Sequence, residues 1–178
     1  MKIYNGILKF HAITLVMRFY ESVAARICDD ITLDRLTMDP FRVGKLLSEK
    51  VEDKREVSRR MYDTCLWSNV IAFLADYSVH QVILVYGYYV YYRAKRSRQK
   101  QKGDSSAVID GPMYLSFLMK STRLAFSRLM GLYAAAFGGA WGSRFYPGWG
   151  TLLGSQLGDG MTGTFFDTIF DTIPMLAD

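Results

Sequence analysis

The longest hydrophobic run in the chain covers residues 65–92, where Asp76 is the only formal charge. About 20 apolar residues are enough to cross the hydrocarbon core of a bilayer, so this run predicts a transmembrane helix. The run ends in a tyrosine-rich stretch, and a cluster of basic residues follows it: Arg93, Lys95, Arg96, Arg98, Lys100 and Lys102. Aromatic residues followed by positive charges are typical of a span that meets the cytosolic, matrix or stromal side. We therefore expect 93–111 to form a basic loop on that side, where its charges set topology or contact lipid headgroups.

The residues before this run carry two other patterns. Residues 3–28 are apolar around most of a helical surface yet contain several charges, which predicts a helix at the membrane interface. Residues 40–64 are dense in charge and keep only a narrow apolar stripe, which predicts a long exposed helix leading into the transmembrane helix. Asp39 and Pro40 suit the start of this helix, because aspartate is a good N-cap and proline fits the first turn.

Small residues recur every four positions in the second half of the chain, in two sets: Ala134, Gly138 and Gly142, then Gly150, Gly154 and Gly158. Four residues are about one helical turn, so each set forms a stripe along one helix. Glycine costs roughly 1 kcal/mol in a helix interior, and its repeated use indicates backbones in contact. Because Pro147 lies between the stripes, helices over 112–143 and 150–173 are predicted to form a hairpin. The stripes resemble those of glycine-zipper proteins over residues 131–158, and we expect a closely packed glycine-zipper hairpin at about 131–163.

Few ionisable residues lie inside the apolar segments. Asp76 and His80 are one helical turn apart and share a face, and Arg128 or Arg144 is a suitable third partner. Asp159 lies between two glycines in the last helix. Buried ionisable groups at membrane depth either make structural hydrogen bonds or line a transport pathway, and both alternatives stay open here.

Composition narrows the possible functions further. The chain has 178 residues, 50% of them hydrophobic, a formal net charge of +5 and two cysteines, Cys28 and Cys65, without metal-ligand spacing. This favours a single domain over 1–178 and excludes a disulfide scaffold. No phosphate-binding loop, dinucleotide fingerprint, nucleophile elbow or zinc-protease motif occurs, so we expect no enzyme, catalytic residue, metal or cofactor. The basic run directly follows the tyrosines, which favours lipid headgroups over nucleic acid.

These patterns together predict an all-α integral membrane protein of an intracellular organelle, with two or three spans. We expect a small structural subunit or assembly factor of a membrane complex, whose partners are membrane lipid and other subunits or further copies of the chain. One alternative is a small channel or transporter that uses Asp76, His80 and Asp159. The other is a soluble helical binding module whose apolar runs form its core.

Overall fold

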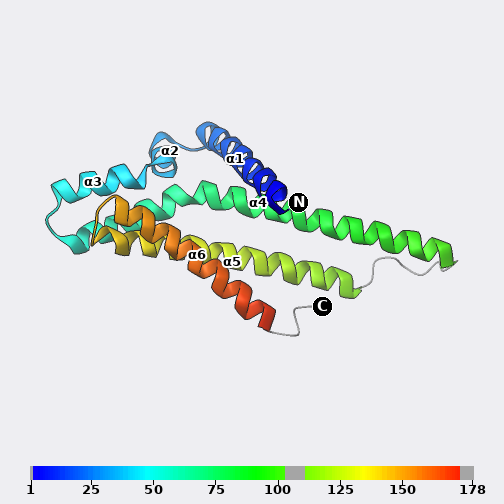
Figure 1. Ribbon diagram of the computed structural model, residues 1–178. Coiled ribbons are helices and arrows are strands. Elements are labelled where there is room, and N and C mark those ends of the chain that lie inside the picture. Colours follow the sequence, from blue (N-terminus) through cyan, green and yellow to red (C-terminus); the bar gives the residue numbers. More distant parts are fainter. Residues whose placement is uncertain (1, 103–110, 173–178) are drawn as a thin grey trace.

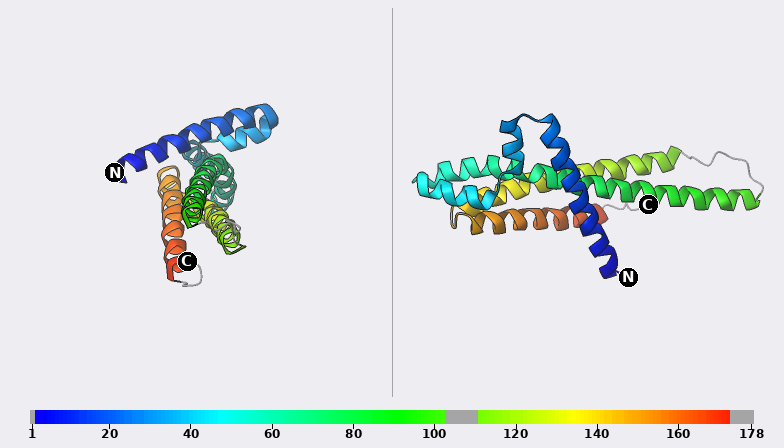
Figure 2. Two further views of the ribbon diagram at one scale, coloured as in Figure 1. Left: turned by 90° about the vertical axis from the view of Figure 1, so that its right-hand side faces the viewer. Right: turned by 90° about the horizontal axis from the view of Figure 1, so that it is seen from above.

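The computed structural model describes residues 2–102 and 111–172, and this part of the chain contains six α-helices (Figure 1). In chain order they are α1 (Lys2–Ile27), α2 (Asp30–Thr37), α3 (Pro40–Lys50), α4 (Lys54–Lys102), α5 (Gly111–Ser143) and α6 (Trp149–Thr172). The all-α class predicted from the sequence is confirmed. Helix α5 packs along both α4 and α6, whereas α1 crosses α4 obliquely (Figure 2).

Helix α3 packs against the turn between α5 and α6, which lies far from it in the sequence. The Asp39 side chain accepts a hydrogen bond from the Phe41 backbone N–H at 3.0 Å, and Pro40 occupies the first turn, as expected from the sequence. The Phe41 ring packs edge to face on Trp149, with 5.5 Å between the ring centroids. Gly148 adopts a φ of +86° beside Phe41, a conformation that glycine tolerates and most residues avoid. This contact fixes α3 against the hairpin turn.

The structure differs from the single exposed helix predicted over 40–64. Helix α3 ends at Lys50, and Val51 is extended at φ −124° and ψ 116°. Helix α4 begins at Lys54, where the Asp53 carboxylate accepts a hydrogen bond from the Arg55 backbone N–H at 2.9 Å. An aspartate that caps a new helix start competes with continuation of the old helix, which explains the break.

One segment predicted as a loop contains helix instead. Residues 93–102 of the predicted basic loop continue α4, because lysine, arginine, glutamine and alanine favour helix and no glycine occurs before Gly103. Residues 103–110 of that loop lie outside the described residues. The connector after α1 holds the short helix α2, which begins after Asp29.

The buried core is small and lies at the hairpin end of α4. It contains Val57, Met61, Cys65 and Ala136, with Leu47 packed against it. Many large apolar side chains are exposed on the outer surfaces of α1, α4, α5 and α6, among them Ile7, Phe10, Val82, Tyr86, Phe126, Phe137, Trp141, Leu153, Leu157 and Met161. Within the described residues one helix, Lys54–Ser97 of α4, is long and apolar enough to cross a membrane, and 17% of its most apolar window is buried. This finding rests on length and composition.

Candidate functional site

The two small-residue stripes face each other in the α5–α6 hairpin. Gly138 lies against Gly154, Gly142 against Gly150, and Ala134 against Gly158. A Cβ atom built on Gly138 would overlap the carbonyl group of Gly154, with 2.9 Å to its carbonyl carbon. The same overlap arises in the opposite direction, because a Cβ on Gly154 would be 2.8 Å from the carbonyl carbon of Gly138. The two backbones therefore lie too close together for even an alanine side chain to fit between them at van der Waals distance.

A third contact brings α4 onto this hairpin. A Cβ on Gly139 would lie 2.7 Å from the Cys65 sulfur, so this glycine admits the Cys65 side chain. The buried Ser58 hydroxyl donates a hydrogen bond to the Ala140 carbonyl at 2.9 Å. The small residues of α5 thus allow close contact with two helices, α6 on one side and α4 on another.

The structure brings Asp76, His80 and Arg128 together between α4 and α5. A terminal guanidinium nitrogen of Arg128 lies 2.9 Å from Asp76 Oδ2, and the other lies 3.1 Å from His80 Nε2. His80 Nδ1 lies 2.8 Å from the Asp76 carbonyl oxygen. Because arginine can only donate, Nε2 accepts in this contact, which leaves Nδ1 as the nitrogen that donates to the Asp76 carbonyl. The Asp76–Arg128 pair then balances its own charge.

The other members of the predicted polar set lie differently. Asp76, His80 and Arg128 are half-buried, and Asp159 is exposed, so the expectation of four buried groups is corrected. Asp159 lies over Gly131, where a Cβ would be 3.0 Å from its Oδ1 atom. It is still near enough to Arg128 to attract it electrostatically. Arg144 is not the third partner of the cluster, because its guanidinium packs over the Trp141 ring at 5.5 Å.

Polar contacts that the sequence analysis missed connect α4 to its neighbours on either side of this cluster. They are Tyr20 with Ser78, Gln81 with Ser121, and Tyr88 with Ser116, each at 2.8 Å. The signal available in the sequence was the presence of serine and glutamine within otherwise apolar helices. Such residues commonly join helices where few other polar partners exist.

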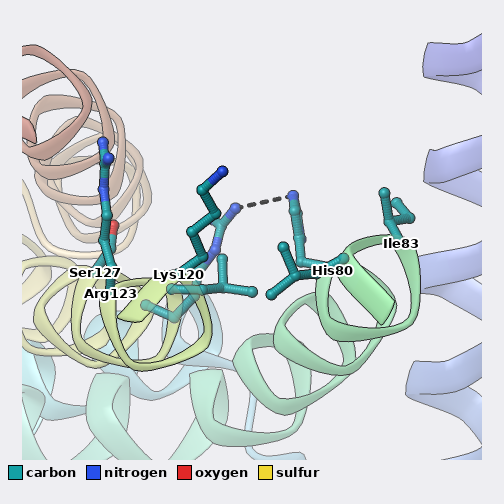
Figure 3. A pocket seen from close by; sticks show the side chains of 8 residues that line it. His80, Ile83, Lys120, Arg123 and Ser127 are labelled. Carbon is teal, nitrogen blue, oxygen red and sulfur yellow. Dashed lines mark hydrogen bonds between the residues drawn. The ribbon is translucent and has the colours of Figure 1, made fainter. Parts of the chain in front are cut away.

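A pocket of about 440 Å³ opens beside the cluster, between α4 and α5 (Figure 3). Its lining combines charged and polar side chains with apolar ones: His80, Ile83, Leu84, Lys120, Arg123, Leu124, Ser127 and Arg128. Figure 3 shows Lys120 and Arg123 extending from α5 toward the same side as His80 on α4. None of these lining residues is acidic. This pocket was not predicted, because its lining comes from two segments far apart in the sequence.

The predicted headgroup-contacting residues lie on the last turns of α4. Arg93 and Arg96 are exposed there, and Lys95 is half-buried. Arg98, Lys100 and Lys102 belong to the same helix. Within the described ranges, 2–102 and 111–172, no group of three His, Cys, Asp or Glu residues is arranged to hold a metal ion. Comparison of the chain with protein-family models, curated proteins and solved structures gives no match.

Proposed function

We propose that this protein is a small structural subunit or assembly factor embedded in a membrane. The observation that carries the proposal is the outer surface of the helices. Phe137 and Leu153 are each 62% exposed, and they belong to a set of large apolar side chains spread over α1, α4, α5 and α6. Soluble monomers rarely expose apolar surface on this scale, whereas lipid or partner helices would cover it.

The glycine stripes refine the proposal. Their contacts are used within the hairpin, where Gly138 and Gly154 face each other, and no glycine face remains for another subunit at these positions. Partner helices would therefore bind the outer apolar side chains instead. Under this proposal the hairpin acts as a rigid unit that presents Phe137 and Leu153 to its surroundings.

The polar cluster is consistent with a membrane location. A charged side chain inside a bilayer is energetically costly unless it is paired. In the structure Arg128 forms an ion pair with Asp76, and its second terminal nitrogen donates a hydrogen bond to His80. The hydrogen bonds of Tyr20 with Ser78, Gln81 with Ser121 and Tyr88 with Ser116 satisfy further polar groups between helices. These contacts would hold the helices together where lipid provides little hydrophobic drive for association.

Two experiments test the two parts of this proposal. Alkaline extraction of membranes from cells that express the full chain should leave the protein in the pellet, and release into the supernatant would contradict membrane embedding. For the subunit role, a photo-crosslinking amino acid at Leu153 should capture a discrete partner protein. The matched control is the same amino acid at Glu52, an exposed polar position beside α3. Crosslinks only to lipid at Leu153, or equal capture at Glu52, would reject the subunit role.

One observation favours transport as a second candidate function. Two members of the Asp76–His80–Arg128 cluster, His80 and Arg128, line the pocket of about 440 Å³ and are therefore accessible from outside the helix pair. A transport role predicts proton or ion flux in liposomes that contain the purified protein alone. We expect no flux above that of empty liposomes if the protein is a structural subunit.

A further inference from the structure

We propose that a second pocket, between α2 and α4, binds a phosphocholine group, in which a phosphate and a quaternary ammonium are joined by a short linker. This α2–α4 pocket has a volume of about 440 Å³, within the usual range of about 300–1,000 Å³ for small-molecule sites. Its lining combines two guanidinium groups, one carboxylate and one indole ring with a hydroxyl and a thioether: Arg35, Met38, Arg60, Asp63, Thr64 and Trp67.

The spacing of the α4 residues explains how they come to share one wall of the pocket. Arg60, Asp63, Thr64 and Trp67 follow the pattern i, i+3, i+4 and i+7, which places them on one face of a helix. Helix α2 packs against α4 and adds Arg35 to the lining. The pocket therefore unites charges that come from two helices.

The charges of the α2–α4 pocket are open to a ligand. Arg35 and Asp63 are both exposed, and neither side chain forms an ion pair or hydrogen bond with the described part of the chain. Arg60 contacts Glu56 through Nε at 2.8 Å, and that contact leaves its two terminal nitrogens free to donate. With Glu56 included, two positive and two negative charges cancel. The pocket therefore favours a ligand that carries both signs over a bare anion or cation.

Trp67 indicates which cation the pocket suits. The residue is 38% exposed and its indole ring is part of the lining, so a ligand can reach the ring. Aromatic rings attract a cation placed over their face, indole does so best, and quaternary ammonium groups are recognised in this way. Asp63 lies one helical turn before Trp67, where its carboxylate can balance the ammonium charge.

The arginines suit the other end of the ligand. A guanidinium group is planar and donates several hydrogen bonds in a fixed geometry that matches phosphate oxygens. Arg35 comes from α2 and Arg60 from α4, so a phosphate between them would be held by both helices. A carboxylate and an indole for the ammonium, with guanidinium groups for the phosphate, together match the two ends of phosphocholine.

The sequence position of the pocket favours a phospholipid as the source of this group. Arg60 and Asp63 belong to the charge-dense residues before Cys65, whereas Trp67 lies at the start of the apolar run 65–92. In a membrane-embedded protein such a boundary lies at the headgroup level, where tryptophan is enriched. The phosphocholine site itself does not depend on the proposed function, whereas the choice of a lipid source rests on it.

The test uses the full chain, purified in an uncharged maltoside detergent, and four lipids with identical acyl chains. Phosphatidylcholine carries both charged groups, phosphatidic acid only the phosphate, a diacyl trimethylammonium-propane only the ammonium, and diacylglycerol neither. Native mass spectrometry measures the binding of each lipid. We expect phosphatidylcholine to bind about tenfold more tightly than either singly charged lipid, because each of these lacks one charged contact. Equal binding of the four lipids, or of phosphatidylcholine and phosphatidic acid, would overturn the proposal.

Free phosphocholine distinguishes the two sources of the ligand. Displacement of phosphatidylcholine by an equal concentration of free phosphocholine would assign the site to a soluble ligand. We expect the lipid to stay bound under these conditions, which assigns the site to the headgroup of a phospholipid.

Variants at the two ends of the ligand decide whether this pocket is responsible. Asp63→Asn should abolish the preference for phosphatidylcholine over phosphatidic acid and keep its preference over the trimethylammonium lipid. Arg35→Gln should have the converse effect. Trp67→Leu should weaken binding of both ammonium lipids about threefold and leave phosphatidic acid unchanged. Arg59→Gln, an exposed position on α4 outside the lining, is the matched control and should change each ratio less than about twofold.

The ratio of two lipids bound by one sample is insensitive to a partial loss of folded protein, and circular dichroism checks the folding of each variant. Unchanged ratios in Asp63→Asn and Arg35→Gln, or an equal change in Arg59→Gln, would contradict the site.

The test of the proposed function can fail independently of this one. A protein that resists alkaline extraction but binds all four lipids equally would lose the phosphocholine site and keep its membrane role. A protein that alkali releases but that binds free phosphocholine through Arg35 and Asp63 would keep the site and lose the lipid source.

Discussion

Substitution of Gly154 provides the sharpest test of the hairpin. A Cβ at this position would overlap the carbonyl group of Gly138 and would also lie 3.4 Å from the Gly139 nitrogen. The obstacle is backbone, not the flexible end of a side chain, so it cannot turn away. Both helices would have to separate at the centre of their contact. The two neighbouring pairs, Gly142 with Gly150 and Ala134 with Gly158, would then also move apart.

The expected magnitude follows from this geometry. The nearest atom to the new Cβ is the Gly138 carbonyl oxygen, which is closer than the carbonyl carbon at 2.8 Å, so the helices must move apart by roughly 1 Å to restore ordinary contact. Overpacking of this kind costs about 1–3 kcal/mol, and alanine recovers up to about 1 kcal/mol through its better helix propensity. We therefore expect Gly154→Ala to lower the free energy of unfolding by about 1–2 kcal/mol. Gly154→Leu adds a branched side chain at the same place and should lower it by about 3 kcal/mol or more.

The assay is reversible unfolding of the purified chain in mixed detergent micelles, followed by circular dichroism. Gly160→Ala is the matched control on the same helix, because a Cβ at Gly160 meets nothing within 4 Å. Gly87→Ala on α4 is a second control for the same reason. Both should be neutral or slightly stabilising. If Gly154→Ala and Gly154→Leu unfold like the parent, or if Gly160→Ala is equally damaging, the backbone contact does not hold the hairpin together.

Two further predictions concern the polar cluster and the topology. Asp76→Leu leaves Arg128 without its carboxylate and should lower the free energy of unfolding by about 1–3 kcal/mol, while Asp76→Asn loses the charge but keeps an acceptor oxygen and should cost less. The same unfolding assay checks both variants, and an Asp76→Leu variant that unfolds like the parent would contradict a stabilising role for the Asp76–Arg128 pair. Ser97→Cys, at an exposed position near the end of α4, should react with an impermeant thiol reagent from the cytosolic, matrix or stromal side, and labelling only from the opposite side would reverse the assigned orientation.

The sequence already indicated the helices and the spacing of their small residues. Asp39 and Pro40 predicted a helix start that the structure contains, because the cap depends on adjacent residues alone. The break at 51–53 is also a local feature, but the dense charge over residues 40–64 predicts one continuous exposed helix and does not distinguish Asp53 as a cap. Helix formation through 93–102 was underestimated in the same way, because clustered basic charge was given more weight than helix propensity.

The polar site depended on tertiary structure to a greater extent. An interval of four residues placed Asp76 and His80 on one helix face, yet it could not choose between Arg128 and Arg144 as the third partner. That choice depends on the register of α5 against α4, which is set by close contacts such as Gly139 with Cys65 and Ser58 with the Ala140 carbonyl. The pocket arises from the same register, because it unites Lys120 and Ser127 with His80 across two helices. Sequence periodicity determines which residues share a face, but only the packing of one backbone on another decides which faces meet.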